Sequence, residues 1–240
     1  MDKIRISFIV AANNDMILGE NLLRSSAFLS GKYQFIFQRG YHNVPKAYND
    51  AWDKAEADLL VFLHQDVFLP DEWVENLIHS IKILDKESWG VLGVAGVTLA
   101  GDVQEYFGHI RQNEWEWEGN LGRLPARVDT LDELLLIAKR ELSLRFDEKI
   151  PMAHFYGADL CLQASSCGFL CFAIEAYCHH NTIGSANSNS FRLAEDYMRK
   201  KWKDRLPFAT TCVIVKKGLL KHKIHQMLID FLRRRSDFRP

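Results

Sequence analysis

Short apolar runs alternate with stretches of helical periodicity along the first part of the chain. Residues 4–12, 33–37 and 59–63 are rich in aliphatic, aromatic and β-branched side chains, which is typical of strands buried on both faces of a parallel sheet. Residues 15–29 and 45–55 lie between these runs and repeat apolar positions at helical spacing, the second beginning with a proline. The pattern therefore predicts a βαβαβ unit.

The alternation continues with a helix predicted over 70–84 and a strand over 89–97. Elements in this order favour an α/β fold with an open, mostly parallel central sheet flanked by helices. In such sheets, ligands bind at the carboxyl ends of the strands. Residues 101–215 have a mixed pattern of strands and loops, with helices predicted from Gly157 and over 191–202.

Length and composition fit one globular domain over 1–215. The 240 residues are 48% hydrophobic, enough for a large core, and no apolar run reaches the roughly 20 residues of a membrane helix. The apolar run at 8–12 is too short for a signal peptide, so a cytoplasmic protein is expected. The cysteine number is odd, at five, and no Cys-x-x-Cys pair occurs, which favours free thiols over disulfides or a zinc ribbon.

A basic segment closes the chain. Residues 216–240 hold eight Lys or Arg and two Asp, a charge of +6, and this leaves −7 on the rest because the net charge is −1. Apolar residues recur there at helical spacing, so an amphipathic helix is predicted. It could lie on an anionic membrane, dock on the core or form a dimer contact. The acidic body argues against nucleic-acid binding.

Two side chains that can bind metal follow the apolar run at 59–63. His64 and Asp66 point to the same side of an extended backbone, so both could face one divalent ion. Alternatively, Asp66 caps the turn before Pro70, because turns favour Asp.

This region resembles the family-two glycosyltransferases of GT-A type. Residues 62–70, Phe-Leu-His-Gln-Asp-Val-Phe-Leu-Pro, are similar to the f-L-D-a-D-d-x-x-p stretch of that family. Residues 156–168 resemble its E-D-x-d-l-x-x-r-a-x-x-x-G segment. Further matches, in the same chain order, are the opening strand and turn at 9–15, the helix start at 46–51, the g-x-F-D-E turn at 144–148 and the His-x-x-x-G segment at 180–184. The His-Gln-Asp-Val and Val-Asp-Thr-Leu-Asp signatures are closest to the branch named after streptomycin biosynthesis.

The resemblance implies an inverting transfer of a sugar from a nucleotide diphosphate sugar to an acceptor hydroxyl, aided by Mn²⁺ or Mg²⁺. Asp66 and His180 would ligate the metal together with His64, with His179 as the competitor of His180. Asp159 would be the general base, although an acidic residue at a helix start also suits the helix dipole.

Residues 1–100 would then form the nucleotide-binding half and 101–215 the acceptor half. The expected donor contacts lie at strand ends and on the next helix: Ala11, Asn14, Gln38, Lys46, Asn49 and Gln65. Each of them could equally serve a turn or a cap.

Acceptor contacts are expected from Trp115, Trp117 and Asp132. In an extended segment the two tryptophans share one side and the intervening acids the other, an arrangement that suits a saccharide or lipid-linked saccharide. The alternative is a β-hairpin whose tryptophans pack into the core.

Three residues depart from the family pattern. His64 replaces a carboxylate, Gln38 replaces an acidic residue that contacts the nucleotide base, and Ala158 replaces the Glu before the predicted catalytic Asp159. A protein that binds nucleotide sugars without turnover is therefore the alternative prediction.

Overall fold

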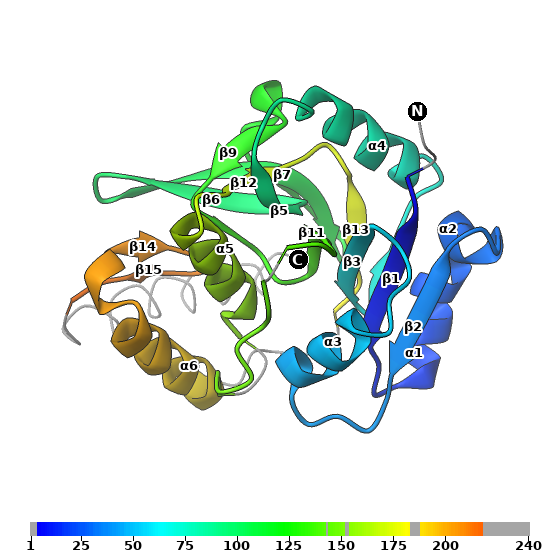
Figure 1. Ribbon diagram of the computed structural model, residues 1–240, viewed down its shortest axis with the longest axis horizontal. Helices are drawn as coiled ribbons and strands as arrows, with labels where there is room; N and C mark the ends of the chain where they lie inside the picture. The colour runs from blue at the N-terminus through cyan, green and yellow to red at the C-terminus, as the bar shows by residue number, and fades with distance from the viewer. Residues whose placement is uncertain (1–3, 143, 152–153, 183–187, 218–240) are drawn as a thin grey trace, which may run out of the picture.

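The computed structural model describes residues 4–142, 144–151, 154–182 and 188–217, and the predicted helix over 216–240 lies almost entirely outside them. Two β-sheets form the centre of the molecule, and helices cover them (Figure 1). In the described part of the chain, no helix has the length and apolar character that crossing a membrane requires.

The first sheet has seven strands in the described residues and contains both predicted halves of the chain. In spatial order its strands are β2 (Gln34–Gln38), β1 (Ile6–Ala11), β3 (Leu59–His64), β11 (Leu135–Lys139), β5 (Trp89–Gly93), β12 (Leu170–Ala173) and β9 (Ala126–Val128). β1 is parallel to β2 and β3, and β12 is parallel to β5, while β11 is antiparallel to both of its neighbours. The halves 1–100 and 101–215 are thus interleaved in space.

The second sheet forms the other wall of the site. Its strands, in spatial order, are β10 (Thr130–Leu131), β6 (Ala95–Ala100), β7 (Val103–Gln112), β13 (Cys178–His180) and β4 (Val67–Phe68), with β8 (Trp115–Glu118) paired to β7. β14 (Phe208–Ala209) and β15 (Ile214–Val215) form a separate pair.

Helices pack around both sheets, with α4 and α5 on different sides of the molecule (Figure 1). Their bounds are α1 (Asp15–Glu20), α2 (Ser26–Leu29), α3 (Val44–Trp52), α4 (Trp73–Ile83), α5 (Tyr156–Ser166) and α6 (Ser188–Lys201), with 3-10 turns η1 (Leu22–Arg24), η2 (Leu121–Arg123) and η3 (Lys203–Arg205). α3 begins where predicted, because Asn43 caps it by accepting from the Lys46 amide at 2.8 Å and Pro45 lies in its first turn.

Two predicted elements are divided. The helix predicted over 15–29 becomes α1, η1 and α2, because Asn21 leaves helical geometry and its side chain donates to the Ile17 carbonyl. The strand predicted over 89–97 becomes β5 and β6, which belong to different sheets. Gly93 and Gly96 flank the crossing, where an added Cβ would lie 3.0 Å from a Leu131 methyl group.

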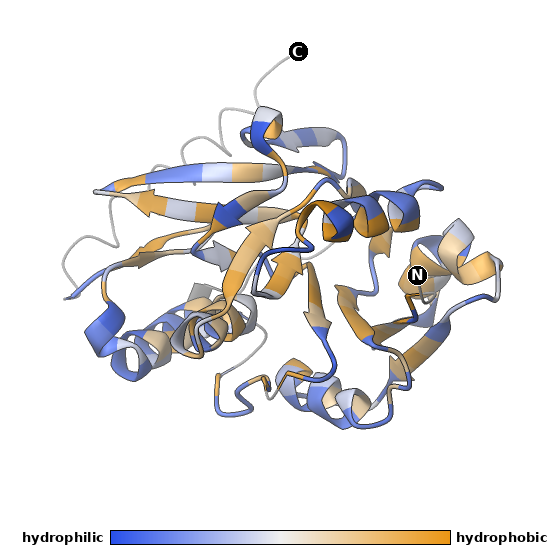
Figure 2. Ribbon diagram, turned by 45° about the horizontal axis from the view of Figure 1, so that its top comes forward, coloured by the Kyte–Doolittle hydropathy of each residue, from blue (hydrophilic) through white to orange (hydrophobic). Residues whose placement is uncertain are grey.

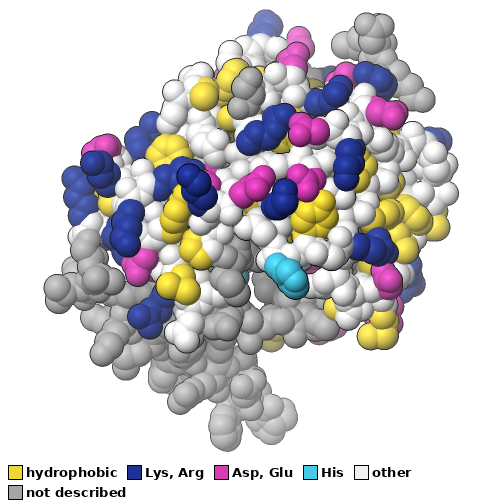
Figure 3. Space-filling model, turned by 60° about the horizontal axis from the view of Figure 1, so that its bottom comes forward, with side chains coloured by type: hydrophobic (Ala, Val, Ile, Leu, Met, Phe, Trp, Pro, Cys, Tyr) yellow, Lys and Arg dark blue, Asp and Glu magenta, His cyan; other side chains and the backbone are white. Residues whose placement is uncertain are grey.

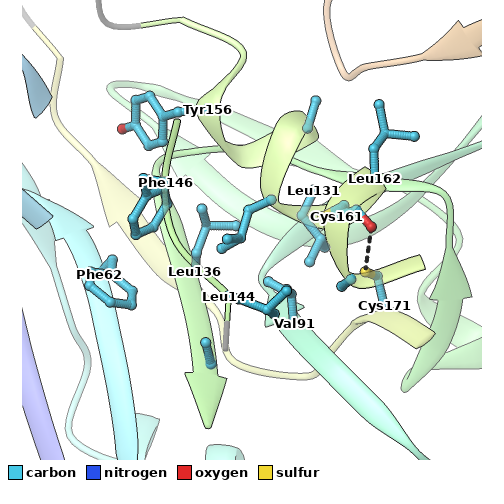
Figure 4. Close-up of a cluster of buried hydrophobic side chains, with 14 of the residues drawn as sticks. Phe62, Val91, Leu131, Leu136, Leu144, Phe146, Tyr156, Cys161, Leu162 and Cys171 are labelled. Atoms are coloured by element: carbon cyan, nitrogen blue, oxygen red, sulfur yellow. Dashed lines mark hydrogen bonds between the residues drawn. The ribbon is translucent and has the colours of Figure 1, made fainter. Parts of the chain in front are cut away.

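The core lies on both faces of the first sheet. Hydrophobic strands run through the middle of the molecule, whereas the helices also carry hydrophilic positions (Figure 2). One core cluster joins β3, β11 and α5, and Figure 4 shows Phe62, Phe146 and Tyr156 along its edge. All five cysteines are free, as predicted, although Cys167 and Cys212 are exposed.

Candidate active site

Three parallel strands end side by side at one edge of the first sheet. The last residue of β1, Ala11, is paired with Gln38 of β2 and with His64 of β3. Asn14 and Gln65 follow directly in the loops. The structure thus gathers predicted donor residues at the carboxyl ends of parallel strands, the usual ligand-binding edge of such sheets.

Gln65 and Asn14 organise the loop after β1. The side-chain oxygen Oε1 of Gln65 accepts from the backbone amides of Asn13 and Asn14 at 2.9 and 3.0 Å. The Asn14 side chain caps α1 by accepting from the amides of Met16 and Ile17. Both side chains therefore shape the loop, and the cap role that the sequence left open for Asn14 is present.

The other predicted donor residues differ in how available they are. The buried Gln38 side chain donates to the Ala47 carbonyl at 2.9 Å, and the Asn49 amide exchanges two hydrogen bonds with the backbone of Phe146. Lys46 is exposed and pairs with Asp50 at 3.3 Å. Gln38 and Asn49 thus position the site's elements, whereas Lys46 is held by the Asp50 ion pair at the surface.

His64, Asp66 and His180 form a group that could hold a metal ion. One ligand atom from each lies within 4.8 Å of the other two. His180 reaches Asp66 because β13 pairs with β4, with His180 opposite Val67, and its Nε2 lies 3.5 Å from Asp66 Oδ1. Two imidazoles and a carboxylate suit a divalent transition metal and leave positions open for diphosphate oxygens.

The charges of this trio are coupled. Burial and the neighbouring His180 lower the pKa of His64, which favours the neutral imidazole that binds metals. Burial is the largest single influence on Asp66 and His180 and opposes their ionisation, but their mutual hydrogen bond and the nearby opposite charges together outweigh it, so the pKa of Asp66 is lowered and that of His180 is raised.

His179 lies apart from the trio. Its ring contacts Phe68 and Tyr177, with centroids 5.3 and 5.2 Å away, on the opposite face of β13 from His180. Of the two histidines left open by the sequence, the structure brings His180 to Asp66.

Tyr156 links the trio to the acceptor half. Its hydroxyl lies 2.8 Å from His64 Nε2 and 3.3 Å from the Glu133 carbonyl oxygen. Figure 4 shows this hydroxyl directed away from the other labelled side chains of the core cluster. The tyrosine therefore orients the His64 ring.

Asp159 occupies an interior ion pair. Its side chain is fully buried, it lies 2.7 Å from the Lys201 ammonium, and it accepts from Trp202 Nε1 at 2.8 Å. Gln163 donates to its second oxygen at 2.7 Å. Both oxygens are thus occupied inside the protein, an arrangement that gives no support to the predicted base role.

Glu133 is a site residue that the sequence interpretation missed. Its Oε1 accepts from the Phe155 amide at 3.1 Å, and its side chain is half-buried beside α5. Burial, followed by the charge of Asp132, raises the pKa of Glu133 to about 8, although the Phe155 hydrogen bond acts in the opposite direction. Its position directly after the predicted acceptor residue Asp132 was the available signal.

The predicted acceptor residues lie in different surroundings. β8 forms the expected hairpin with β7, in which Trp117 packs edge-on against Tyr106 while Trp115 is 72% exposed. Asp132 accepts from Thr211 Oγ1 at 2.6 Å and from the Leu134 amide at 3.1 Å. Trp115 is therefore the tryptophan with an exposed aromatic face. Through Thr211, Asp132 links the loop between β14 and β15 to the site.

Comparisons with known proteins agree with this architecture. A family model described as "Glycosyltransferase like family" matches residues 7–201. A relative from Fuscovulum blasticum, "ATP synthase subunits region ORF 6", is 31% identical over 153 residues, which are 59% of this chain and 58% of that protein. The match thus spans little more than half of the relative.

Two solved structures share the fold. The crystal structure of GalNAc-T7 with UDP, GalNAc and Mn²⁺ has a TM-score of 0.57 at 12% identity, over 84% of this chain and 49% of that chain. The structure of S. aureus TarS 1-349 in complex with UDP-GlcNAc has a TM-score of 0.54 at 14% identity, over 98% of this chain and 73% of that chain. The predicted α/β fold of GT-A type is confirmed.

Proposed function

The chain belongs to the glycosyltransferase-like family, and from this premise we propose that it transfers a sugar from a nucleotide diphosphate sugar to an acceptor hydroxyl. The observation that carries the proposal is the trio His64, Asp66 and His180 at the end of β3, beside the loop that Gln65 organises. That edge brings candidate metal ligands to the carboxyl ends of parallel strands, where ligands usually bind.

His64, Asp66 and His180 would hold Mn²⁺ or Mg²⁺. When bound, such an ion supplies positive charge that stabilises the departing diphosphate. The protein's own contribution is orientation: Tyr156 fixes the His64 ring, and the β13–β4 pairing fixes His180 against Asp66. We propose an inverting displacement, which requires a base beside the attacking hydroxyl.

The acceptor side follows a row across the second sheet. His180 of β13 is opposite Gln112 of β7, and Gln112 is opposite Trp115 of β8. Paired residues share a face of a sheet. Two strand spacings separate the backbones of Trp115 and His180, which gives about 10 Å across the sheet. An exposed tryptophan at that distance suits stacking of an acceptor sugar ring, so a saccharide acceptor is proposed.

Thermal unfolding with nucleotides tests the donor site. UDP, GDP, CDP and dTDP are each added with and without Mn²⁺, and UDP is the first probe because the two solved structures of similar fold hold UDP and UDP-GlcNAc. A ligand that binds only the folded state at 100 times its Kd adds about 2.7 kcal/mol of stability. One nucleotide is expected to raise the Tm only with Mn²⁺, and Asp66→Ala is expected to abolish the shift.

The exposed Asp71, which lies beyond β4 and outside the trio, provides the matched control. Asp71→Ala should keep the full shift. If no nucleotide stabilises the wild type, the donor site is wrong. Binding without sugar transfer to any acceptor would favour the alternative, a nucleotide-sugar-binding protein without turnover.

We further propose that the chain belongs to the streptomycin-type branch, acts in the cytoplasm and forms a homodimer. A peripheral membrane contact through residues 216–240 is proposed as well, and it would suit a lipid-linked acceptor. The basic charge of that segment supports the membrane contact.

A further inference from the structure

We propose that Glu133 is the group that takes the proton from the acceptor hydroxyl, a role that rests on the sugar transfer proposed above. Three features of the structure support this assignment: the hydrogen bonds that link its backbone to a candidate metal ligand, the way its carboxylate is held, and the saturation of the neighbouring carboxylates.

Glu133 lies in the connection between β10 and β11, next to the trio. The carbonyl of the following residue, Leu134, accepts from the His64 amide at 3.0 Å. The carbonyl of Glu133 itself accepts from the Tyr156 hydroxyl, which contacts His64 Nε2. Backbone and side-chain contacts thus tie this residue to a candidate metal ligand from two directions.

One carboxylate oxygen is fixed and the other is open. Phe155, which donates its amide to Oε1, has a left-handed backbone with φ of 66°, a conformation that non-glycine residues rarely adopt. In the part of the chain that the structure describes, no side chain donates to the Glu133 carboxylate, which also accepts from its own backbone amide, and the side chain is only half-buried. The carboxylate is therefore oriented by α5 while one oxygen can accept a proton.

The neighbouring carboxylates are already bonded. Asp132 accepts from Thr211 and Leu134, and Asp159 from Trp202 and Gln163. The backbone of Glu133 packs closely against the start of α5, since an added Cβ at Gly157 would lie 3.2 Å from the Glu133 Cα. Among these three acids, Glu133 is the one with an oxygen available.

Its protonation equilibrium suits the task. Burial and Asp132 raise the pKa of Glu133 to about 8, and the hydroxyls of Tyr48 on α3 and Tyr156 on α5 are the other titratable groups that face it. A base whose pKa lies near the working pH combines proton affinity with a useful ionised fraction.

The proposed step is balanced. The acceptor oxygen attacks the anomeric carbon and forms the new glycosidic bond while its proton passes to the Glu133 carboxylate. The bond between the anomeric carbon and the diphosphate oxygen breaks, and its electron pair leaves with the nucleoside diphosphate. Glu133 then releases the proton to solvent.

Release of nucleoside diphosphate with water as the acceptor tests this role. The probes are UDP-glucose, UDP-N-acetylglucosamine, GDP-mannose and dTDP-glucose with Mn²⁺. In Glu133→Gln the side-chain amide oxygen can still accept from Phe155. This variant should release nucleoside diphosphate at least about 100-fold more slowly than the wild type, since general bases contribute roughly 10²–10⁴-fold. Glu133→Asp should retain part of the rate, and the exposed Glu87→Gln should retain all of it.

The pH profile separates a proton acceptor from a structural residue. The wild-type rate should rise with pH as Glu133 ionises, with a limb near pH 8 that Glu133→Gln lacks. Nucleotide stabilisation should be equal in the two proteins. Unchanged turnover and pH profile in Glu133→Gln, or nucleotide binding by the wild type without release from any probe, overturns the assignment. A wild type that binds no nucleotide instead overturns the donor site.

Discussion

Asp159 and Glu133 are acidic residues on the same side of the protein, but their surroundings give them opposite properties. Asp159 is enclosed with a cation and two donors, so its charge is neutralised within the fold. Glu133 receives hydrogen bonds from backbone amides only, together with the repulsion of Asp132. The first arrangement stabilises a structure, while the second keeps a carboxyl reactive.

Asp159→Asn should destabilise the protein by about 2 kcal/mol, because the buried carboxylate loses the charge-assisted bonds that it accepts from Lys201 and Trp202. Urea unfolding followed by tryptophan fluorescence measures this loss. Asp53→Asn breaks an ion pair with Arg145, in which the Asp53 side chain is 72% exposed. This change should lower the free energy of unfolding by less than about 1 kcal/mol. Unchanged stability together with lost turnover in Asp159→Asn would restore the base role to this residue.

At the residue scale, sequence was most informative where a side chain follows a strand directly. His64 and Asp66 could be placed together from spacing alone, whereas their proximity to His180 rested on a family motif. The role of Asn49 could not be predicted, because it depends on contact with Phe146, distant in the chain. When the family motif is aligned from residue 156, its E-D pair falls on Tyr156 and Gly157 rather than on Ala158 and Asp159. The motif alone therefore did not require a base at Asp159.

At the scale of elements, the passage of the chain from β5 to β6 defines the joint between the two sheets. Gly108 of β7 lies opposite Ala95 with φ of 118°, and an added Cβ would come 2.0 Å from the Val94 carbonyl oxygen. The backbones approach too closely there for any side chain. The joint matters for the site because β7 also supplies Gln112, between His180 and Trp115.

Gly108→Ala should therefore destabilise the protein by about 3 kcal/mol or more, since both backbone conformation and space oppose it. Gly122→Ala, which meets nothing within 4 Å, should change stability by less than about 0.5 kcal/mol. Comparison of the two Tm values checks this, and similar values would show that β7 can move away from Val94.

Hydrophobic periodicity predicted the type of most elements in the first hundred residues, but not their divisions. A continuous apolar run at 89–97 contains no local sign that its two ends join different sheets, because both ends are buried. The antiparallel insertion of β11 between β3 and β5 was equally hidden, since strand order depends on packing between distant segments.

At the scale of the whole molecule, surface charge is mixed. On the face in Figure 3, Lys and Arg side chains lie beside Asp and Glu side chains over much of the described surface. Ion pairs such as Arg5–Asp58 and Arg145–Asp53 fit this pattern and contribute little individually. Changes of stability with pH near neutrality should therefore depend strongly on the buried groups.

Glu133 should make the protein less stable as pH rises. Below its ordinary pKa of 4.5 the carboxyl is protonated in both states; between 4.5 and about 8 the unfolded chain releases a proton that the folded one retains, which favours unfolding. Without metal, Glu133→Gln should exceed the wild type in stability by on the order of 2 kcal/mol at pH 8 and by less at pH 5. Urea titrations at both pH values measure the gain, with Glu87→Gln as the control. A gain that shrinks towards pH 8 would contradict the raised pKa.

The place of β11 in the first sheet also constrains the order of events during synthesis. β1, β2 and β3 leave the ribosome long before β11, so β3 has an unpaired edge until residues 135–139 arrive. His180 emerges later still, and until then His64 and Asp66 lack their third partner. The proposed ligand binding would thus be acquired late in folding, and a nascent chain would gain the proposed metal-dependent stabilisation only when both halves have closed around each other.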